Sequence, residues 1–65
     1  MKIKLNGEVY ETSAANLKQL LQELRIVTNS VAIELNLTII RKADHENTAI
    51  KENDTVEIIQ FVGGG

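Results

Sequence analysis

The sequence predicts an α+β fold in which a four- to five-stranded mixed sheet carries one main helix across one face. Apolar and polar residues alternate near both ends of the 65-residue chain, as they do in strands with one buried face. A single stretch spaces its apolar residues as a helix does. A chain of this length forms one small domain, so the one helix has to cover one face of the sheet.

The first strand is predicted by an alternating segment: Met1, Lys2, Ile3, Lys4 and Leu5. Asn6-Gly7 then marks a tight turn. A loop of these two residues alone would place Leu5 opposite Glu8, whereas a three-residue loop pairs Leu5 with Val9 and keeps both on one face. We therefore predict a three-residue loop and a returning strand over residues 9–12.

The helix is predicted by four leucines at the spacing i, i+3, i+4 and i+7, namely Leu17, Leu20, Leu21 and Leu24. Polar residues occupy the opposite side of this stretch. Asn16, followed three residues later by Gln19, resembles a capping box, and Ser13 is an alternative start. We interpret the leucine stripe as core that packs on the sheet, because buried leucine needs no special role.

Two strands and two connections are predicted beyond the helix. Apolar residues alternate over residues 31–35, a turn follows at Asn36-Leu37, and a short strand occupies residues 38–40. Residues 41–47 are polar and aperiodic, which predicts a surface loop. Residues 52–54 predict a turn before the last strand.

The last strand carries apolar residues on both of its faces. Val56 and Ile58 alternate with Glu57, while Ile59 and Phe61 place bulky groups on the second face. One helix cannot cover both sets. The order of hairpin, helix, strand, short strand and last strand is that of a β-grasp fold, with the first and last strands parallel and central.

The uncovered face is interpreted as a docking surface, with Ile59, Phe61 and Val62 as the partner interface. The alternative is that the loop at residues 41–47 covers these side chains.

Composition excludes several classes of function. The net charge of −2, the lack of a basic stretch and an aromatic content limited to Tyr10 and Phe61 argue against nucleic-acid binding. The absence of cysteine removes disulfides, metal–thiolate sites and a thiol nucleophile, and we expect no metal. Met1 leads into the first strand without an apolar signal stretch, and no run approaches membrane-spanning length, so we expect a cytoplasmic protein without membrane contact. His45 is expected to be a solvated loop side chain without a catalytic role.

The most informative feature is the final run of Gly63, Gly64 and Gly65. Residues without a Cβ can pass through a slot too narrow for side chains. Residues 62–65 would reach about 13 Å when extended. We predict a single domain at residues 1–62 and a flexible tail that is threaded into another protein's active site, where the Gly65 carboxylate reacts. The alternative is an ordinary flexible end.

Four segments together resemble the ThiS family, the sulfur carriers of thiamine biosynthesis within the ubiquitin-like β-grasp group. The patterns are I-x-L-N-G-E at residues 3–8, N-L-x-x-L-L at 16–21, V-A-I-x-x-N at 31–36 and D-x-V-E-I-x-x-F-V-G-G-G at 54–65. The last pattern is the most specific, and the resemblance covers essentially the entire chain. Leu37 and Asn53 depart from the family pattern, because glycine is usual at both positions.

The resemblance implies that the chain is a protein co-substrate and not an enzyme. An E1-like adenylyltransferase of the ThiF type would use MgATP to convert the Gly65 carboxylate into an acyl-adenylate, and the chain itself would bind no cofactor. A sulfur donor such as a cysteine desulfurase would displace AMP. The resulting thiocarboxylate would then supply sulfur to a thiazole synthase of the ThiG type.

Three alternatives remain compatible with the sequence. The small subunit of molybdopterin synthase shares the fold, the Gly-Gly end and the thiocarboxylate chemistry, but is generally longer. A ubiquitin-like modifier would begin with the same activation and differ in the final nucleophile, an amine instead of sulfur. A non-covalent binding module would not need the glycines.

Overall fold

The computed structural model describes residues 1–61, and these residues form five strands, one α-helix and two 3-10 turns. In chain order the elements are β1 (Lys2–Leu5), β2 (Glu8–Glu11), α1 (Leu17–Glu23), η1 (Thr28–Ser30), β3 (Val31–Leu35), β4 (Thr38–Ile40), η2 (Lys42–Asp44) and β5 (Thr55–Gln60). The predicted domain end at Val62 and the tail of Gly63, Gly64 and Gly65 lie outside the described residues.

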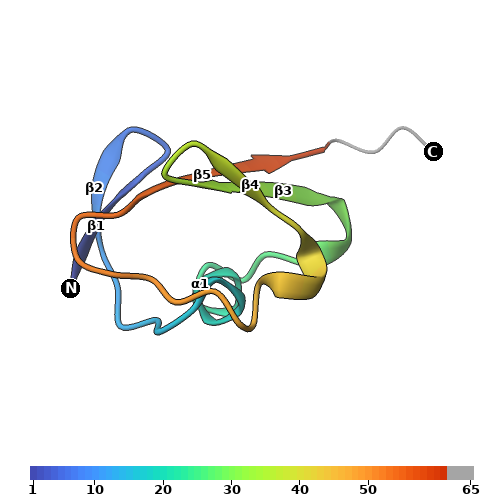
Figure 1. The fold of residues 1–65 in the computed structure, drawn as a ribbon, viewed down its shortest axis with the longest axis horizontal. Coiled ribbons are helices and arrows are strands. Elements are labelled where there is room, and N and C mark those ends of the chain that lie inside the picture. Colours follow the sequence, from blue (N-terminus) through green and yellow to red (C-terminus); the bar gives the residue numbers. More distant parts are fainter. Residues whose placement is uncertain (62–65) are drawn as a thin grey trace.

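The described strands form one mixed sheet with the order β2-β1-β5-β3-β4. The central strand β5 is parallel to β1 and antiparallel to β3. Helix α1 crosses one face of the sheet, and the segment between β4 and β5 runs along the same side (Figure 1). This is the predicted β-grasp arrangement. The opposite face, which we call the open face, carries no helix of the described residues.

The core lies between α1 and the sheet. Leu17, Leu20 and Leu21 are fully buried and belong to one cluster with Ile33 and Val56, which confirms the leucine stripe as core. No helix in the described range is both long and apolar enough to cross a bilayer.

The helix begins where the capping pattern predicts. The Asn16 side-chain oxygen accepts a hydrogen bond from the Gln19 backbone N–H at 2.8 Å, and the Gln19 side chain accepts one from the Ala15 N–H at 2.8 Å. The two side chains thus satisfy backbone donors on either side of the helix start. The alternative start at Ser13 is wrong.

The loop of the first hairpin is shorter than predicted. Leu5 lies opposite Glu8 and Lys4 opposite Val9, so the loop consists of Asn6 and Gly7 alone. Both residues have positive φ, +49° and +85°, as a type I′ turn requires, and this turn matches the natural twist of two strands. The three-residue loop is therefore wrong, and Val9 lies on the open face instead of the core face.

The second hairpin also has a two-residue loop with positive φ angles, but its second residue is leucine instead of glycine. Leu35 lies opposite Thr38, so Asn36 and Leu37 form the loop with φ of +51° and +73°. The Asn36 side-chain oxygen accepts a 2.9 Å hydrogen bond from the Thr55 N–H, which ties the turn to the start of β5. Leu37 is 88% exposed, and a side chain with a Cβ is strained in this left-handed conformation.

The connection at residues 41–47 is more ordered than a surface loop. It contains η2, and the side chain of His45 is only 4% exposed, so the expectation of a solvated histidine is wrong. The His45 Nε2 donates to the carbonyl oxygen of Ile40 at 3.0 Å. Its own backbone carbonyl accepts from the Lys18 N–H at 3.3 Å, which docks the connection on the first turn of α1 and turns the ring inward.

Candidate partner-binding face

Strand β5 presents two predicted interface residues on the open face. Val56 and Ile58 point toward the core and are buried, so Ile59 points the opposite way and is 49% exposed. Phe61 follows on the same face, is 58% exposed, and its backbone N–H donates to the Ser30 carbonyl at 2.7 Å. Ile59 is held by its pairing with Ala32 of β3, and Phe61 is held by the hydrogen bond of its backbone to Ser30, so both positions are set by β3 and the residue that precedes it.

Two further exposed apolar side chains share this face. Val9 of β2 lies opposite Lys4 of β1. Ile39 of β4 lies opposite Glu34 of β3. We call Val9, Ile39, Ile59 and Phe61 together the open-face patch. Sequence reasoning did not assign Val9 and Ile39 to it. Two adjacent apolar residues in a strand point to opposite faces, so the pair at residues 39–40 indicates an apolar residue on the open face, as the pair at residues 58–59 does. Val9 could be assigned to the open face only with the correct length of the first hairpin loop.

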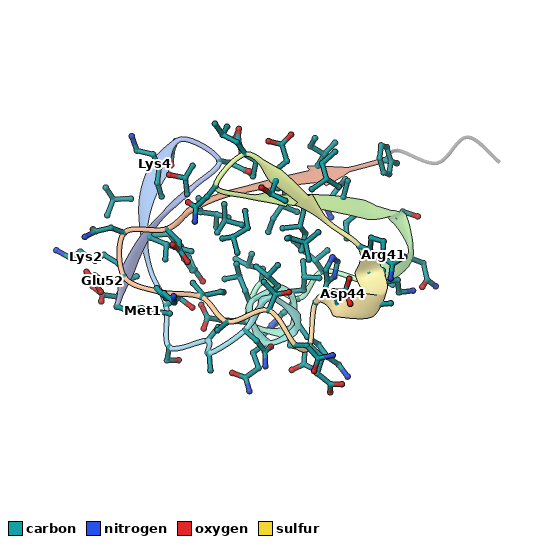
Figure 2. All side chains as sticks on the ribbon, viewed as in Figure 1. Met1, Lys2, Lys4, Arg41, Asp44 and Glu52 are labelled. Atoms are coloured by element: carbon teal, nitrogen blue, oxygen red, sulfur yellow. The ribbon has the colours of Figure 1, made fainter. Side chains whose placement is uncertain are left out.

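The segment at residues 41–47 does not cover Ile59 and Phe61. It runs on the helix side of the sheet (Figure 1). Arg41, which precedes η2, and Asp44, its last residue, lie at the end of the molecule opposite Lys2 and Lys4 (Figure 2). The alternative in which this loop shields the last strand is therefore wrong.

Charged side chains on the open face are paired in two different ways. Lys2 of β1 lies directly opposite Glu11 of β2, which is an opposite-charge pair. Glu34 of β3 lies directly opposite Glu57 of β5, which is a like-charge pair. The open face is therefore polarised, with acidic charge at its β3–β5 side.

The clearest electrostatic coupling in the described part of the chain lies on the other side of the sheet. The Tyr10 hydroxyl donates a 2.6 Å hydrogen bond to Glu23, whose second carboxylate oxygen accepts from the Thr12 hydroxyl at 3.0 Å. The hydrogen bond from Tyr10 lowers the pKa of Glu23, and the same bond raises the pKa of Tyr10. This network joins β2 to the end of α1 and is structural.

The remaining predicted site residues cannot be placed. Val62, Gly63, Gly64 and Gly65 lie outside the described residues. Within residues 1–61, no group of three or more His, Asp or Glu side chains is arranged to hold a metal ion. What the open face offers chemically is apolar contact area, two lysines on β1 and an acidic pair across β3 and β5.

These strands and the single helix place the molecule in the β-grasp class, with a sheet open on one side. The chain belongs to the ThiS family, because the model of that family matches residues 3–65.

Relatives with this domain have two different lengths. The sulfur carrier protein ThiS from Bacillus subtilis strain 168 is 29% identical over 65 residues, which is 97% of this chain and 98% of that protein. The thiazole synthase from Paramagnetospirillum magneticum strain AMB-1 is 39% identical over 66 residues, which is all of this chain but 20% of that protein. The chain thus spans about a fifth of the length of this synthase and of a second one, from Magnetococcus marinus.

A solved structure agrees with the fold over the full chain. The crystal structure of the thiamine biosynthesis protein ThiS from Geobacter metallireducens superposes with a TM-score of 0.83 at 30% identity, with all of both chains covered.

Proposed function

We propose that this protein is a sulfur carrier for thiazole formation in thiamine biosynthesis, with the carboxylate of Gly65 as the group that carries sulfur. The observation that carries the proposal is the open-face patch, which extends to Phe61, the residue that follows the central strand and is separated from the glycine run by Val62 alone. The family match and the Bacillus subtilis relative named as a sulfur carrier support it.

The proposed chemistry has two steps, the first at a carboxylate oxygen of Gly65 and the second at its carbonyl carbon. A carboxylate oxygen of Gly65 attacks the α-phosphorus of ATP in the active site of an E1-like adenylyltransferase, and pyrophosphate leaves. Hydrosulfide supplied by the sulfur donor then attacks the acyl carbon and loses its proton to solvent, and AMP leaves with the electrons of the broken C–O bond. A persulfide nucleophile would instead form an acyl disulfide, which a thiol reductant cleaves to the thiocarboxylate. The product is a thiocarboxylate that donates sulfur to thiazole synthase. In this cycle MgATP is bound by the partner, and the chain acts as co-substrate.

The energetics of tail insertion explain why a folded domain accompanies three glycines. Ordering them in a partner cleft costs roughly 3–6 kcal/mol at about 1–2 kcal/mol per residue. Fully burying an isoleucine or phenylalanine contributes roughly 1.5–3 kcal/mol, so the exposed halves of Ile59 and Phe61 contribute about 2–3 kcal/mol together. The contribution of those two residues alone is smaller than this cost. The proposed interface therefore includes Ile39 and Val9.

The partners follow from the same proposal. They are an adenylyltransferase of the ThiF type, a sulfur donor such as a cysteine desulfurase, and a thiazole synthase of the ThiG type. The two thiazole synthase relatives support the last of these, because each contains a segment similar to this whole chain. We place the cycle in the cytoplasm, where reduced sulfur donors persist.

Release of pyrophosphate tests the first step. The full chain is mixed with the adenylyltransferase of the same organism and MgATP, and a variant that lacks Gly65 serves as the control. We expect pyrophosphate release that depends on the full chain and falls to background with the control. Equal pyrophosphate release with the full chain and with the control would contradict the proposal. So would the absence of release with both, provided that the same enzyme preparation activates another carrier.

A further inference from the structure

The centre of the open face contains two glutamates in direct register. Glu34 of β3 and Glu57 of β5 are cross-strand partners, and both point away from the core because their neighbours Ile33 and Ile58 point into it. Side chains at such paired positions start about 4.5–5.5 Å apart at Cβ. The two carboxylates are therefore held side by side by the backbone.

A like-charge pair in this position opposes folding, because two negative charges directly opposite each other repel. The same sheet avoids this at another pair, where Lys2 lies opposite Glu11. The ion pairs of the described residues use the carboxylates of Glu11, Asp44 and Glu46. The pair at the centre of the sheet is thus a like-charge pair in the isolated domain, which a cation from a partner would neutralise.

Apolar groups frame the two carboxylates. Ile39 lies opposite Glu34 on the outer side, and Ile59 lies two positions beyond Glu57 on the same face of β5. Contact with these isoleucines would exclude water and strengthen the attraction between the carboxylates and an incoming cation. A guanidinium group suits this setting, because it is planar, weakly hydrated and able to bond two carboxylates at once.

We infer that the open face binds a partner protein that places a cationic side chain, best an arginine flanked by apolar groups, over Glu34 and Glu57. The acidic pair sets the register of docking, and the open-face patch supplies the contact area around it. The identity of the partner rests on the proposed function, under which thiazole synthase is the partner that the acidic pair binds. Repulsion in the free domain is relieved when the complex forms.

The test uses the thiazole synthase of the same organism as the probe and measures both affinity and stability. Glu57→Gln removes one charge of the pair with little change in shape, and Glu57→Lys creates an opposite-charge pair with Glu34. Glu46→Gln is the matched control, because it makes the same change in net charge at a surface residue that pairs with Lys18 on the helix side.

We expect opposite changes in the two measurements. The thermal midpoint of the free domain rises by roughly a few degrees in Glu57→Gln and further in Glu57→Lys, because the repulsion is lost. The dissociation constant for the synthase rises about tenfold or more in both variants and loses part of its salt dependence, whereas Glu46→Gln matches the wild type. If the wild type binds the synthase and Glu57→Lys binds it with the same affinity, this inference is wrong and the proposed function is unaffected. Failure of the wild-type chain to bind the synthase would overturn the inference together with the partner assignment, even if Gly65 is adenylated.

Discussion

The side-chain oxygen of Asn6 accepts a 2.7 Å hydrogen bond from the backbone N–H of Ile58, and this bond joins the first turn of the chain to its last strand. Asn6 also has positive φ, so one residue both closes the first hairpin and extends the β1–β5 ladder beyond Leu5. Because β5 carries Ile59 and leads directly into Phe61, this bond helps to fix the strand that presents the proposed interface.

Replacing Asn6 with glycine should lower the free energy of unfolding by about 1–3 kcal/mol, because the partly buried Ile58 N–H loses its acceptor. Glycine keeps the positive φ accessible, so the loss reports on the hydrogen bond and not on the turn. Urea unfolding of the wild type and the variant measures this change in the free energy of unfolding. Asn6→Asp retains an acceptor oxygen and should lose much less; equal losses in the two variants would show that the bond contributes little.

Leu37→Gly should stabilise the protein by about 1 kcal/mol, because glycine adopts the φ of +73° without the steric cost that a Cβ imposes. The leucine is exposed, so little packing is lost. Leu37→Ala is the control, since alanine shortens the side chain but keeps the strain. Similar unfolding midpoints for the alanine and glycine variants would mean that the turn is not strained.

The hydrogen bond between Tyr10 and Glu23 should make stability depend on pH at both extremes. The lowered pKa of Glu23 means that its contribution is complete above the ordinary value of 4.5 and is lost as pH falls through the folded-state pKa. The raised pKa of Tyr10 means that its contribution is complete below 10.0 and is lost as pH rises through the folded-state pKa.

Tyr10→Phe removes the shared hydrogen bond and should flatten both limbs of the profile. The measurement is the unfolding midpoint of the wild type and the variant from acid to alkaline pH, with the difference largest in the plateau between the two limbs. Two parallel curves would show that the hydrogen bond does not carry the pH dependence.

Phe61→Ala should weaken binding to the adenylyltransferase by about tenfold or more, because a central aromatic side chain commonly dominates an interface. Stability should change by less than about 0.5 kcal/mol, because the side chain is mostly exposed. Val27→Ala is the matched control, since Val27 is an exposed apolar residue outside the sheet. Titration calorimetry measures both affinities, and equal affinities for the two variants would remove Phe61 from the interface.

Local patterns in the sequence predicted most of the fold. The leucine spacing identified α1, the Asn16 and Gln19 pair identified its start, alternation identified β3, and the turn after β3 identified β4. The first hairpin failed because the prediction placed Val9 with Leu5 on the core face. The geometry of the Asn6-Gly7 turn outweighs that preference, because its two positive φ angles close a two-residue loop.

The candidate site was predicted only in part, for a physical reason. Ile59 and Phe61 were identified because one strand carried more apolar residues than one face could bury. The Glu34–Glu57 pair depends on the register between β3 and β5, which no local pattern in either strand reveals. The burial of His45 likewise depends on a contact with the Ile40 carbonyl that the polar surroundings of the histidine do not indicate.

The most direct test of the carrier function is the intact mass of the protein after incubation with the adenylyltransferase, MgATP and sulfide. We expect the mass increase that replacement of one oxygen by sulfur produces, located at Gly65 by fragmentation and absent from a chain without Gly65. An unchanged mass, with an enzyme preparation that converts another ThiS protein in the same assay, would contradict the account.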